Sequence, residues 1–139
     1  MAASRLIILS LLMLGTTPLR AAEGPVRISA EEAKGAIFSS PKAVISRRGA
    51  ADTKWVEMLR SKDETMSAGI YEATASRSEI ASYGEDEFMY FLKGGVTLTS
   101  ADGTVTEVEA GDAVTIPKGW KGVWDTKGYT KFYVTYTPK

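Results

Sequence analysis

The sequence of 139 residues contains no cysteine and no histidine. Without cysteine the chain has no disulfide, no thiol nucleophile, no thiolate ligand for a metal and no cysteine to carry a lipid. Without histidine it lacks the commonest metal ligand and the commonest general base. These two absences exclude thiol chemistry, histidine-dependent triads and most transition-metal sites before any motif is considered.

An excess of charge of one sign is also missing, because Lys and Arg number 17 and Asp and Glu number 17. No basic block supplies the positive surface that a phosphate backbone attracts, so we expect no nucleic-acid partner. The hydrophobic content of 44% is that of a globular protein, and the length suits one domain.

Residues 1–21 have the layout of a secretory signal peptide. Arg5 precedes the apolar run LIILSLLMLG, and a polar stretch that ends in small residues follows it. About ten apolar residues are too few for the roughly 20 that a membrane-spanning helix needs, so we expect no stable membrane insertion. We therefore predict cleavage after Ala21 or Ala22 and a periplasmic or secreted mature protein.

Residues 22–64 are predicted to form a short helix and an extended arm. The Ser-x-x-Glu spacing of residues 29–32 is typical of a capping box and predicts a helix over roughly 30–38. The segment 43–48 indicates a strand or an extended arm. The segment 48–65 stays ambiguous, because its apolar residues at spacings of three and four also suit one helical turn.

Residues 65–139 are predicted to form a single β-domain, because short β-prone segments alternate there with turns rich in Gly, Asp and Ser. No long helix interrupts them, which favours an antiparallel sandwich or closed barrel and excludes a parallel sheet. A turn at 126–128 is expected to separate the last two strands. The predicted strands cover residues 66–75, 87–93, 96–100, 105–108, 113–116, 121–126 and 130–137.

Two segments of this region resemble the two motifs of the cupin superfamily. Residues 87–94 (EFMYFLKG) look like the second half of the first motif, and residues 111–119 (GDAVTIPKG) match the G-x5-P-x-G opening of the second. The patterns YxxDE from residue 83 and PxGWxGxW from residue 117 are similar to the ureidoglycine aminohydrolase-type cupin domain family. The resemblance implies an all-β fold, a single RmlC-like cupin β-barrel (an antiparallel jelly roll) with a short N-terminal helix.

The metal ligands of that superfamily are missing from this chain. The first motif of metal-binding cupins reads H-x-H-x3-E, and counting back from Glu87 places its two histidines at Ala81 and Tyr83. The third histidine of the pattern falls at Gly122. One carboxylate is a poor site for a transition metal, so we expect no metal and no cofactor. A weak hard-cation site that includes residues 85–86 is the alternative.

The resemblance and strand alternation together place a pocket inside the barrel. Alternate residues of a strand face the same side, so Glu87, Met89 and Phe91 are expected to point inward. The alternative is that these side chains only fill a small barrel. The predicted ligand-binding residues are Tyr83, Glu87, Met89, Phe91, Trp120, Trp124, Lys131 and Tyr133.

Glu87 is the candidate catalytic residue. A carboxylate inside an apolar barrel is costly unless it is paired, and the candidate partners are Tyr83, Lys131 and Tyr133. Glu87 then either orients a ligand or moves a proton, or it forms only a structural ion pair.

Three functions stay open on the sequence alone. We favour an exported, metal-free cupin that binds a small polar organic molecule. The second is a metal-independent enzyme that acts on a C–N bond or a sugar carbonyl with Glu87 as acid or base. The third is a non-catalytic scaffold, a homodimer in which the segment 43–48 is the pairing arm.

Overall fold

The computed structural model describes residues 24–139, so the predicted signal peptide and its cleavage site lie outside the described residues. No helix in the described part is long and apolar enough to cross a membrane. Two short helices come first, α1 (Ala30–Ala33) and the 3-10 helix η1 (Ala36–Ser39). The strands are β1 (Val44–Arg48), β2 (Ala51–Arg60), β3 (Met66–Ile80), β4 (Asp86–Gly94), β5 (Val96–Ser100), β6 (Val105–Val108), β7 (Ala113–Ile116) and β8 (Gly122–Tyr136).

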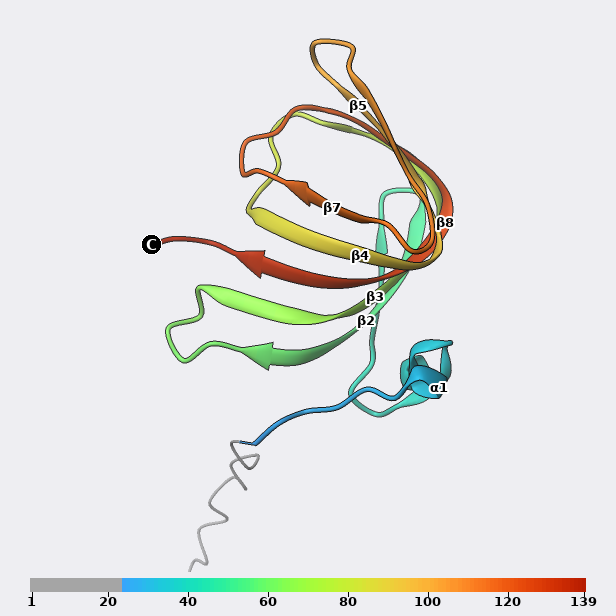
Figure 1. Ribbon diagram of the computed structural model, residues 1–139, viewed down its shortest axis with the longest axis vertical. Coiled ribbons are helices and arrows are strands. Elements are labelled where there is room, and N and C mark those ends of the chain that lie inside the picture. Colours follow the sequence, from blue (N-terminus) through green and yellow to red (C-terminus); the bar gives the residue numbers. More distant parts are fainter. Residues whose placement is uncertain (1–23) are drawn as a thin grey trace, which may run out of the picture.

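All strand pairs are antiparallel, in the order β1-β2-β3-β8-β4-β7, with β5 paired to β8 and β6. The two longest strands, β3 and β8, pair from Met66↔Tyr136 to Ile80↔Gly122. The first part of β8 also pairs with β5, and its last part pairs with β4. Because β8 is shared in this way, the sheet curls into the predicted barrel, as Figure 1 shows.

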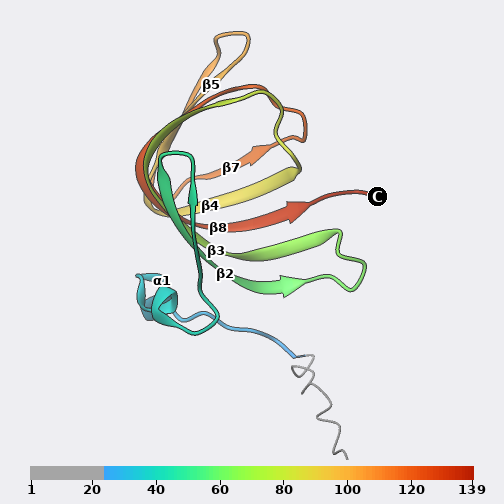
Figure 2. The same cartoon turned by 180° about the vertical axis from the view of Figure 1, so that it is seen from behind.

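The predicted capping box is present at the N-terminal helix. The backbone N–H of Glu32 donates to the Ser29 hydroxyl at 3.2 Å, and the N–H of Ser29 donates to the Glu32 carboxylate at 2.8 Å. The helix is shorter than predicted because Gly35, with φ of 138°, separates α1 from η1. Figure 2 shows α1 beside β2, and Phe38 of η1 packs there against the outer face of the sheet.

The ambiguous segment 48–65 is mainly the strand β2, so the helical-turn interpretation is wrong. β2 pairs with β1 on one side and with β3 on the other. A β-bulge between Glu57 and Leu59 interrupts the two-residue alternation. That interruption is why the apolar spacing of this segment does not read as a strand.

The turn predicted at 126–128 is also wrong, because both predicted strands belong to β8. Gly128 has φ of 114°, and its N–H donates to the Thr126 hydroxyl at 2.9 Å. The Thr126 hydroxyl in turn donates to the carbonyl of Gly95 at 2.5 Å. The glycine bends β8 where it passes from β5 to β4 without ending the strand.

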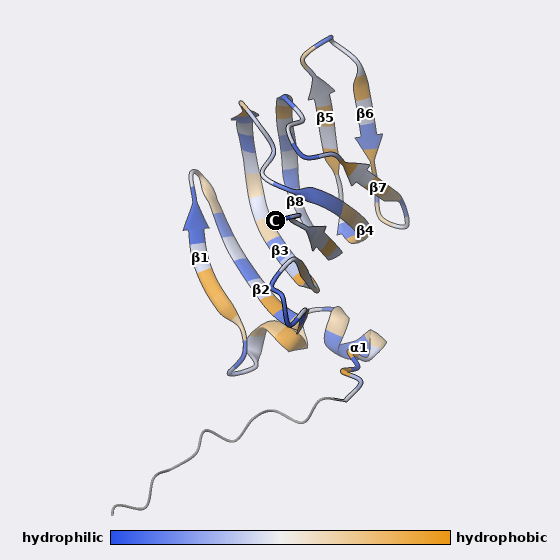
Figure 3. Ribbon diagram, turned by 90° about the vertical axis from the view of Figure 1, so that its left-hand side faces the viewer, coloured by the Kyte–Doolittle hydropathy of each residue, from blue (hydrophilic) through white to orange (hydrophobic). Residues whose placement is uncertain are grey.

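The two faces of the sheet carry different groups of side chains. In β4 the side chains of Glu87, Met89 and Phe91 are buried, whereas Phe88 and Tyr90 are exposed, which confirms the predicted alternation. The main core, which includes Met89 and Phe91, lies inside the barrel. Figure 3 shows that β1, at the sheet edge, has an apolar start and a hydrophilic end.

Replacement of Gly94 by Ala should destabilise the barrel more than the same change at Gly103. Both glycines have positive φ, which costs an alanine about 1 kcal/mol. A Cβ at Gly94 would also clash with the backbone carbonyl of Gly128, whereas nothing lies within 4 Å at Gly103. We expect roughly 1–3 kcal/mol of additional loss for Gly94→Ala in urea unfolding. Equal losses for the two variants would refute the close approach of β4 to β8.

Candidate functional site

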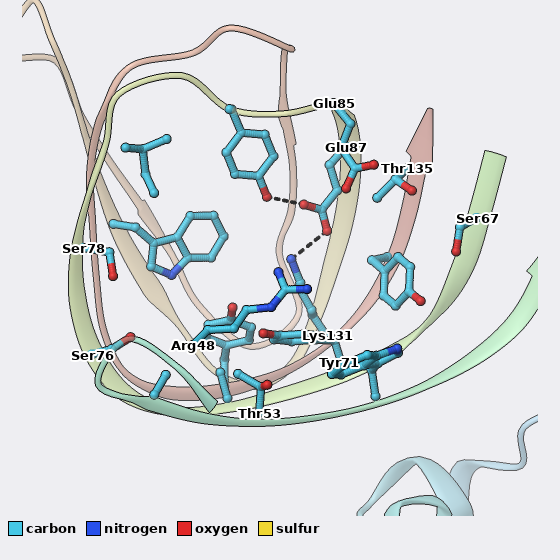
Figure 4. A pocket seen from close by; sticks show the side chains of 18 of the residues that line it. Arg48, Thr53, Ser67, Tyr71, Ser76, Ser78, Glu85, Glu87, Lys131 and Thr135 are labelled. Atoms are coloured by element: carbon cyan, nitrogen blue, oxygen red, sulfur yellow. Dashed lines mark hydrogen bonds and ion pairs between the residues drawn. The ribbon is translucent and has the colours of Figure 1, made fainter. Parts of the chain in front are cut away.

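The inner faces of β2, β3, β4 and β8 line a cavity of about 650 Å³ that is open to solvent, shown from close by in Figure 4. Its side chains are placed by strand alternation, since residues two apart reach the same side of a strand. The charged and aromatic residues that line it are Arg48, Trp55, Glu57, Arg60, Tyr71, Tyr83, Glu85, Glu87, Trp124, Tyr129, Lys131 and Tyr133.

A buried ion pair lies in the wall of this cavity. The Lys131 Nζ of β8 lies 2.7 Å from a carboxylate oxygen of Glu87 in β4, and each side chain is 6% exposed. The ammonium also lies 2.8 Å from the sulfur of Met89. An isolated charge at this depth would be strongly destabilising, so each of the two residues depends on the other.

Tyr83 completes the environment of the Glu87 carboxylate. Its hydroxyl donates to the carboxylate oxygen that Lys131 does not contact. Figure 4 draws the two interactions of the Glu87 carboxylate as dashed lines. The backbone of Tyr83 is held in place by hydrogen bonds with Trp120 at 2.8 Å and Gly119 at 2.7 Å. Two of the three predicted partners of Glu87 are therefore present. No hydrogen bond joins Glu87 to the third, Tyr133, within residues 24–139.

Aromatic rings surround the Lys131 ammonium. Its nitrogen lies 5.3 Å from the ring centroid of Trp124, 5.6 Å from that of Tyr71 and 5.7 Å from that of Tyr129. Ring faces carry negative potential, so they stabilise the cation in addition to the carboxylate. Trp55 stacks on Tyr71 at 6.3 Å and extends the aromatic wall toward β1.

Burial changes the acid–base properties of these groups. It raises the pKa of the Tyr83 phenol well above its usual value, and the neighbouring Glu87 charge raises it further. Burial also raises the pKa of Tyr129, which keeps its hydroxyl protonated at neutral pH. For Lys131 burial lowers the pKa, and the Glu87 carboxylate opposes that shift. Lys131 therefore releases a proton more readily than a solvated lysine does.

Five of the eight predicted ligand-binding residues line the cavity, namely Tyr83, Glu87, Trp124, Lys131 and Tyr133. The other three do not reach its wall. Met89 and Phe91 are fully buried in the adjoining core. Trp120 packs edge-on against Tyr83, and its indole N–H donates to the Ser100 hydroxyl at 3.1 Å.

Sequence reasoning missed Tyr71, Tyr129, Trp55 and Arg48. Strand alternation could have found Tyr129, because it is two residues before Lys131 and shares its face. Tyr71 faces inward because it pairs with Lys131 in the β3–β8 register. Trp55 and Arg48 belong to the region that was ambiguous as a sequence, and only strand pairing brings them to the cavity.

The residues present do not fit the metal of metal-binding cupins. Ala81, Tyr83 and Gly122 stand at the histidine positions, and the remaining carboxylate, Glu87, already holds the Lys131 ammonium. The described residues contain no group of three acidic, His or Cys side chains placed to bind a metal. The Lys131 ammonium thus pairs with Glu87, the one carboxylate that remains of the metal-binding motif.

The curled antiparallel sheet with a side-chain-lined interior pocket agrees with the resemblance to the cupin class of proteins. The chain belongs to the EutQ-like cupin domain family, whose model matches residues 60–133. This confirms the predicted cupin superfamily. A search of curated proteins finds no match.

Solved structures agree on the fold. The EutQ protein of Clostridium difficile is similar at a TM-score of 0.54 and 19% identity, over 68% of this chain and 75% of that chain. A protein of unknown function from Rhizobium leguminosarum matches at 0.57 and 19% identity, over 83% and 99% of the two chains. The polyketide cyclase RemF of Streptomyces resistomycificus matches at 0.53 and 22% identity, over 68% and 72%. At these identities the likeness shows the cupin β-barrel fold and nothing about chemistry.

The losses of stability caused by removing each partner of the buried ion pair should not be additive. Glu87→Gln and Lys131→Met each leave a buried charge unpaired, which we expect to cost ~3–5 kcal/mol in urea unfolding. The double variant should cost clearly less than the sum of the two single variants. The exposed pair Arg77–Asp125 is the control, for which solvent screening limits the loss to ~1 kcal/mol. Additive losses at Glu87 and Lys131 would contradict the pairing.

Proposed function

We propose that this protein is exported and binds a small polar organic molecule in the barrel cavity. The observation that carries the proposal is a charged, hydrogen-bonded group, Glu87 with Lys131 and Tyr83, in the wall of an aromatic cavity of about 650 Å³. That volume lies within the range of small-molecule sites. A barrel that serves only as a scaffold gains little from a buried ion pair, because apolar residues fill such space at lower desolvation cost.

The walls of the cavity suggest how a ligand would be held. The faces of Tyr71 and Trp124 offer flat apolar contact, and the hydroxyls of Tyr129 and Tyr133 offer hydrogen bonds. The buried pair itself would orient the polar part of the ligand. In small-molecule sites, polar groups placed beside aromatic surface fix the orientation of the ligand.

Export and the subfamily are proposals with sequence support only. The signal-peptide layout of residues 1–21 supports a periplasmic or secreted location. The PxGWxGxW pattern from residue 117 supports a relation to the ureidoglycine aminohydrolase-type cupins. The metal-dependent chemistry of that type does not carry over to this chain, because this chain lacks the metal ligands.

Ligand binding should weaken when one aromatic ring is removed from the cavity wall. A thermal-shift screen of sugars, amino acids and ureides should find molecules that raise the Tm, because a ligand that binds only the folded state stabilises it. Tyr71→Ala should weaken their binding by roughly tenfold, the effect of losing an aromatic contact. Tyr90→Ala, on the outer face of β4, should leave the affinity unchanged. A screen without any stabilising molecule would refute the proposed function.

The second candidate function is metal-independent proton-transfer catalysis, which the Tyr83–Glu87–Lys131 network favours. Tyr83 and Lys131 both donate hydrogen bonds to Glu87. Their hydrogen bonds can therefore adjust when Glu87 takes up a proton. The lowered pKa of the buried Lys131 brings that amine closer to the range useful for acid–base work. A C–N bond or a sugar carbonyl is the proposed reacting group.

Glu87→Gln tests this second candidate. Turnover of a ligand from the screen should have a bell-shaped pH–rate profile, and the variant should lower kcat by at least about a hundredfold. Glu57→Gln, which changes a carboxylate in the same cavity wall, should retain the profile. Full activity of the Glu87 variant would remove its proposed catalytic role and leave binding as the function.

A further inference from the structure

The charges of the cavity wall do not all cancel in pairs. Six charged side chains line the cavity, three of each sign. Lys131 pairs with Glu87 at 2.7 Å, and Arg60 pairs with Glu57 at 2.5 Å. One cation and one anion therefore remain, and both face the same cavity.

The remaining cation is Arg48, at the end of the edge strand β1. Its guanidinium lies 5.8 Å from the ring centroid of Trp55, and it forms no side-chain hydrogen bond or ion pair with any of residues 24–139. Figure 4 shows its side chain extending over the cavity. The preceding residue, Arg47, is not part of the cavity wall and lies 3.8 Å from Asp52.

The remaining anion is Glu85, one residue before β4. Its carboxylate accepts a hydrogen bond from the Thr137 hydroxyl at 3.2 Å, and no cation of the described chain lies within ion-pair distance of it. In Figure 4 the Arg48 side chain reaches the middle of the cavity below Glu87, and Glu85 lies above Glu87. The cavity wall thus carries one cation, which is exposed to solvent, and one anion, and neither forms an ion pair with another of the described residues.

We infer that the cavity recognises a dipolar organic molecule, whose carboxylate pairs with Arg48 and whose amino group pairs with Glu85. The inference rests on the proposed function, because it names the chemical class of the ligand for the same cavity. Arginine presents two parallel N–H donors to a carboxylate, which favours this anion. The less polar part of the molecule would then face the rings of Tyr71 and Trp124.

Ligands with a single charge suit the cavity less well. An anion without an amino group would leave Glu85 uncompensated, and an amine without a carboxylate would face the positive Arg48. Like charges placed together are the usual means by which a site rejects the wrong partner. A cavity wall of zero net charge with separated charges therefore matches a ligand of the same kind.

Two sets of probes test the inference by isothermal titration calorimetry. One set is L-phenylalanine with its amide, a cation, and phenylpropanoate, an anion. The other is para-aminomethylbenzoate, a zwitterion whose charges lie farther apart, with the cation para-methylbenzylamine and the anion para-methylbenzoate. In at least one set we expect the zwitterion to bind about fivefold or more tightly than both singly charged analogues, the equivalent of one ion pair.

Three variants test which residue pairs with each charge of the ligand. Arg48→Gln should remove the advantage of the zwitterion over the amine, and Glu85→Gln should remove its advantage over the acid. Arg47→Gln makes the same change in charge one residue away and should alter none of the affinities.

The outcomes separate this inference from the proposed function. Equal affinities within both sets, or equal effects of Arg47→Gln and Arg48→Gln, would overturn the inference. If no probe binds while the thermal-shift screen finds a neutral ligand, the dipolar class is wrong and the binding function stands. If neither the probes nor the screen yields a ligand, both fail.

Discussion

The interior of this barrel depends on one buried ion pair. The Lys131 ammonium and the Glu87 carboxylate lie on neighbouring strands, β8 and β4, and each is tolerated in the core because the other is there. The Tyr83 hydroxyl satisfies the second carboxylate oxygen. Three ring faces surround the ammonium. The pair links the inner faces of β4 and β8, and it gives an aromatic cavity its polar centre.

The same pair changes what the cupin fold can do in this chain. In the metal-binding form that the sequence resembles, a carboxylate and three histidines hold a cation from solution. Here the cation is part of the protein, and it reaches Glu87 from a strand far along the chain. An ammonium offers hydrogen bonds and protons where a metal offers open coordination positions. The binding and proton transfer that we propose would therefore rely on the protein's own side chains.

Local patterns predicted much of the framework. The strands β5, β6 and β7 have their predicted bounds, because short alternating segments between Gly-containing turns are recognisable without tertiary context. The predictions failed where a backbone irregularity lies inside a strand. The bulge between Glu57 and Leu59 concealed β2, and Gly128 bends β8 although a glycine of positive φ usually indicates a turn. Of the site, the motif predicted Glu87 and Tyr83, and the cost of burying an unpaired carboxylate suggested Lys131 of the last predicted strand as a partner.

The sequence by itself determined that thiol and histidine chemistry are excluded, and it determined which side of a strand such as β4 is buried. The absence of histidine and cysteine follows from composition, and alternation follows from the two-residue period of a strand. Only the tertiary structure decided that Lys131, 44 residues away, meets Glu87, and that Tyr71 and Arg48 face the same cavity. Such contacts depend on strand register and sheet curvature, which arise from many long-range pairings together and leave no signal in any single segment.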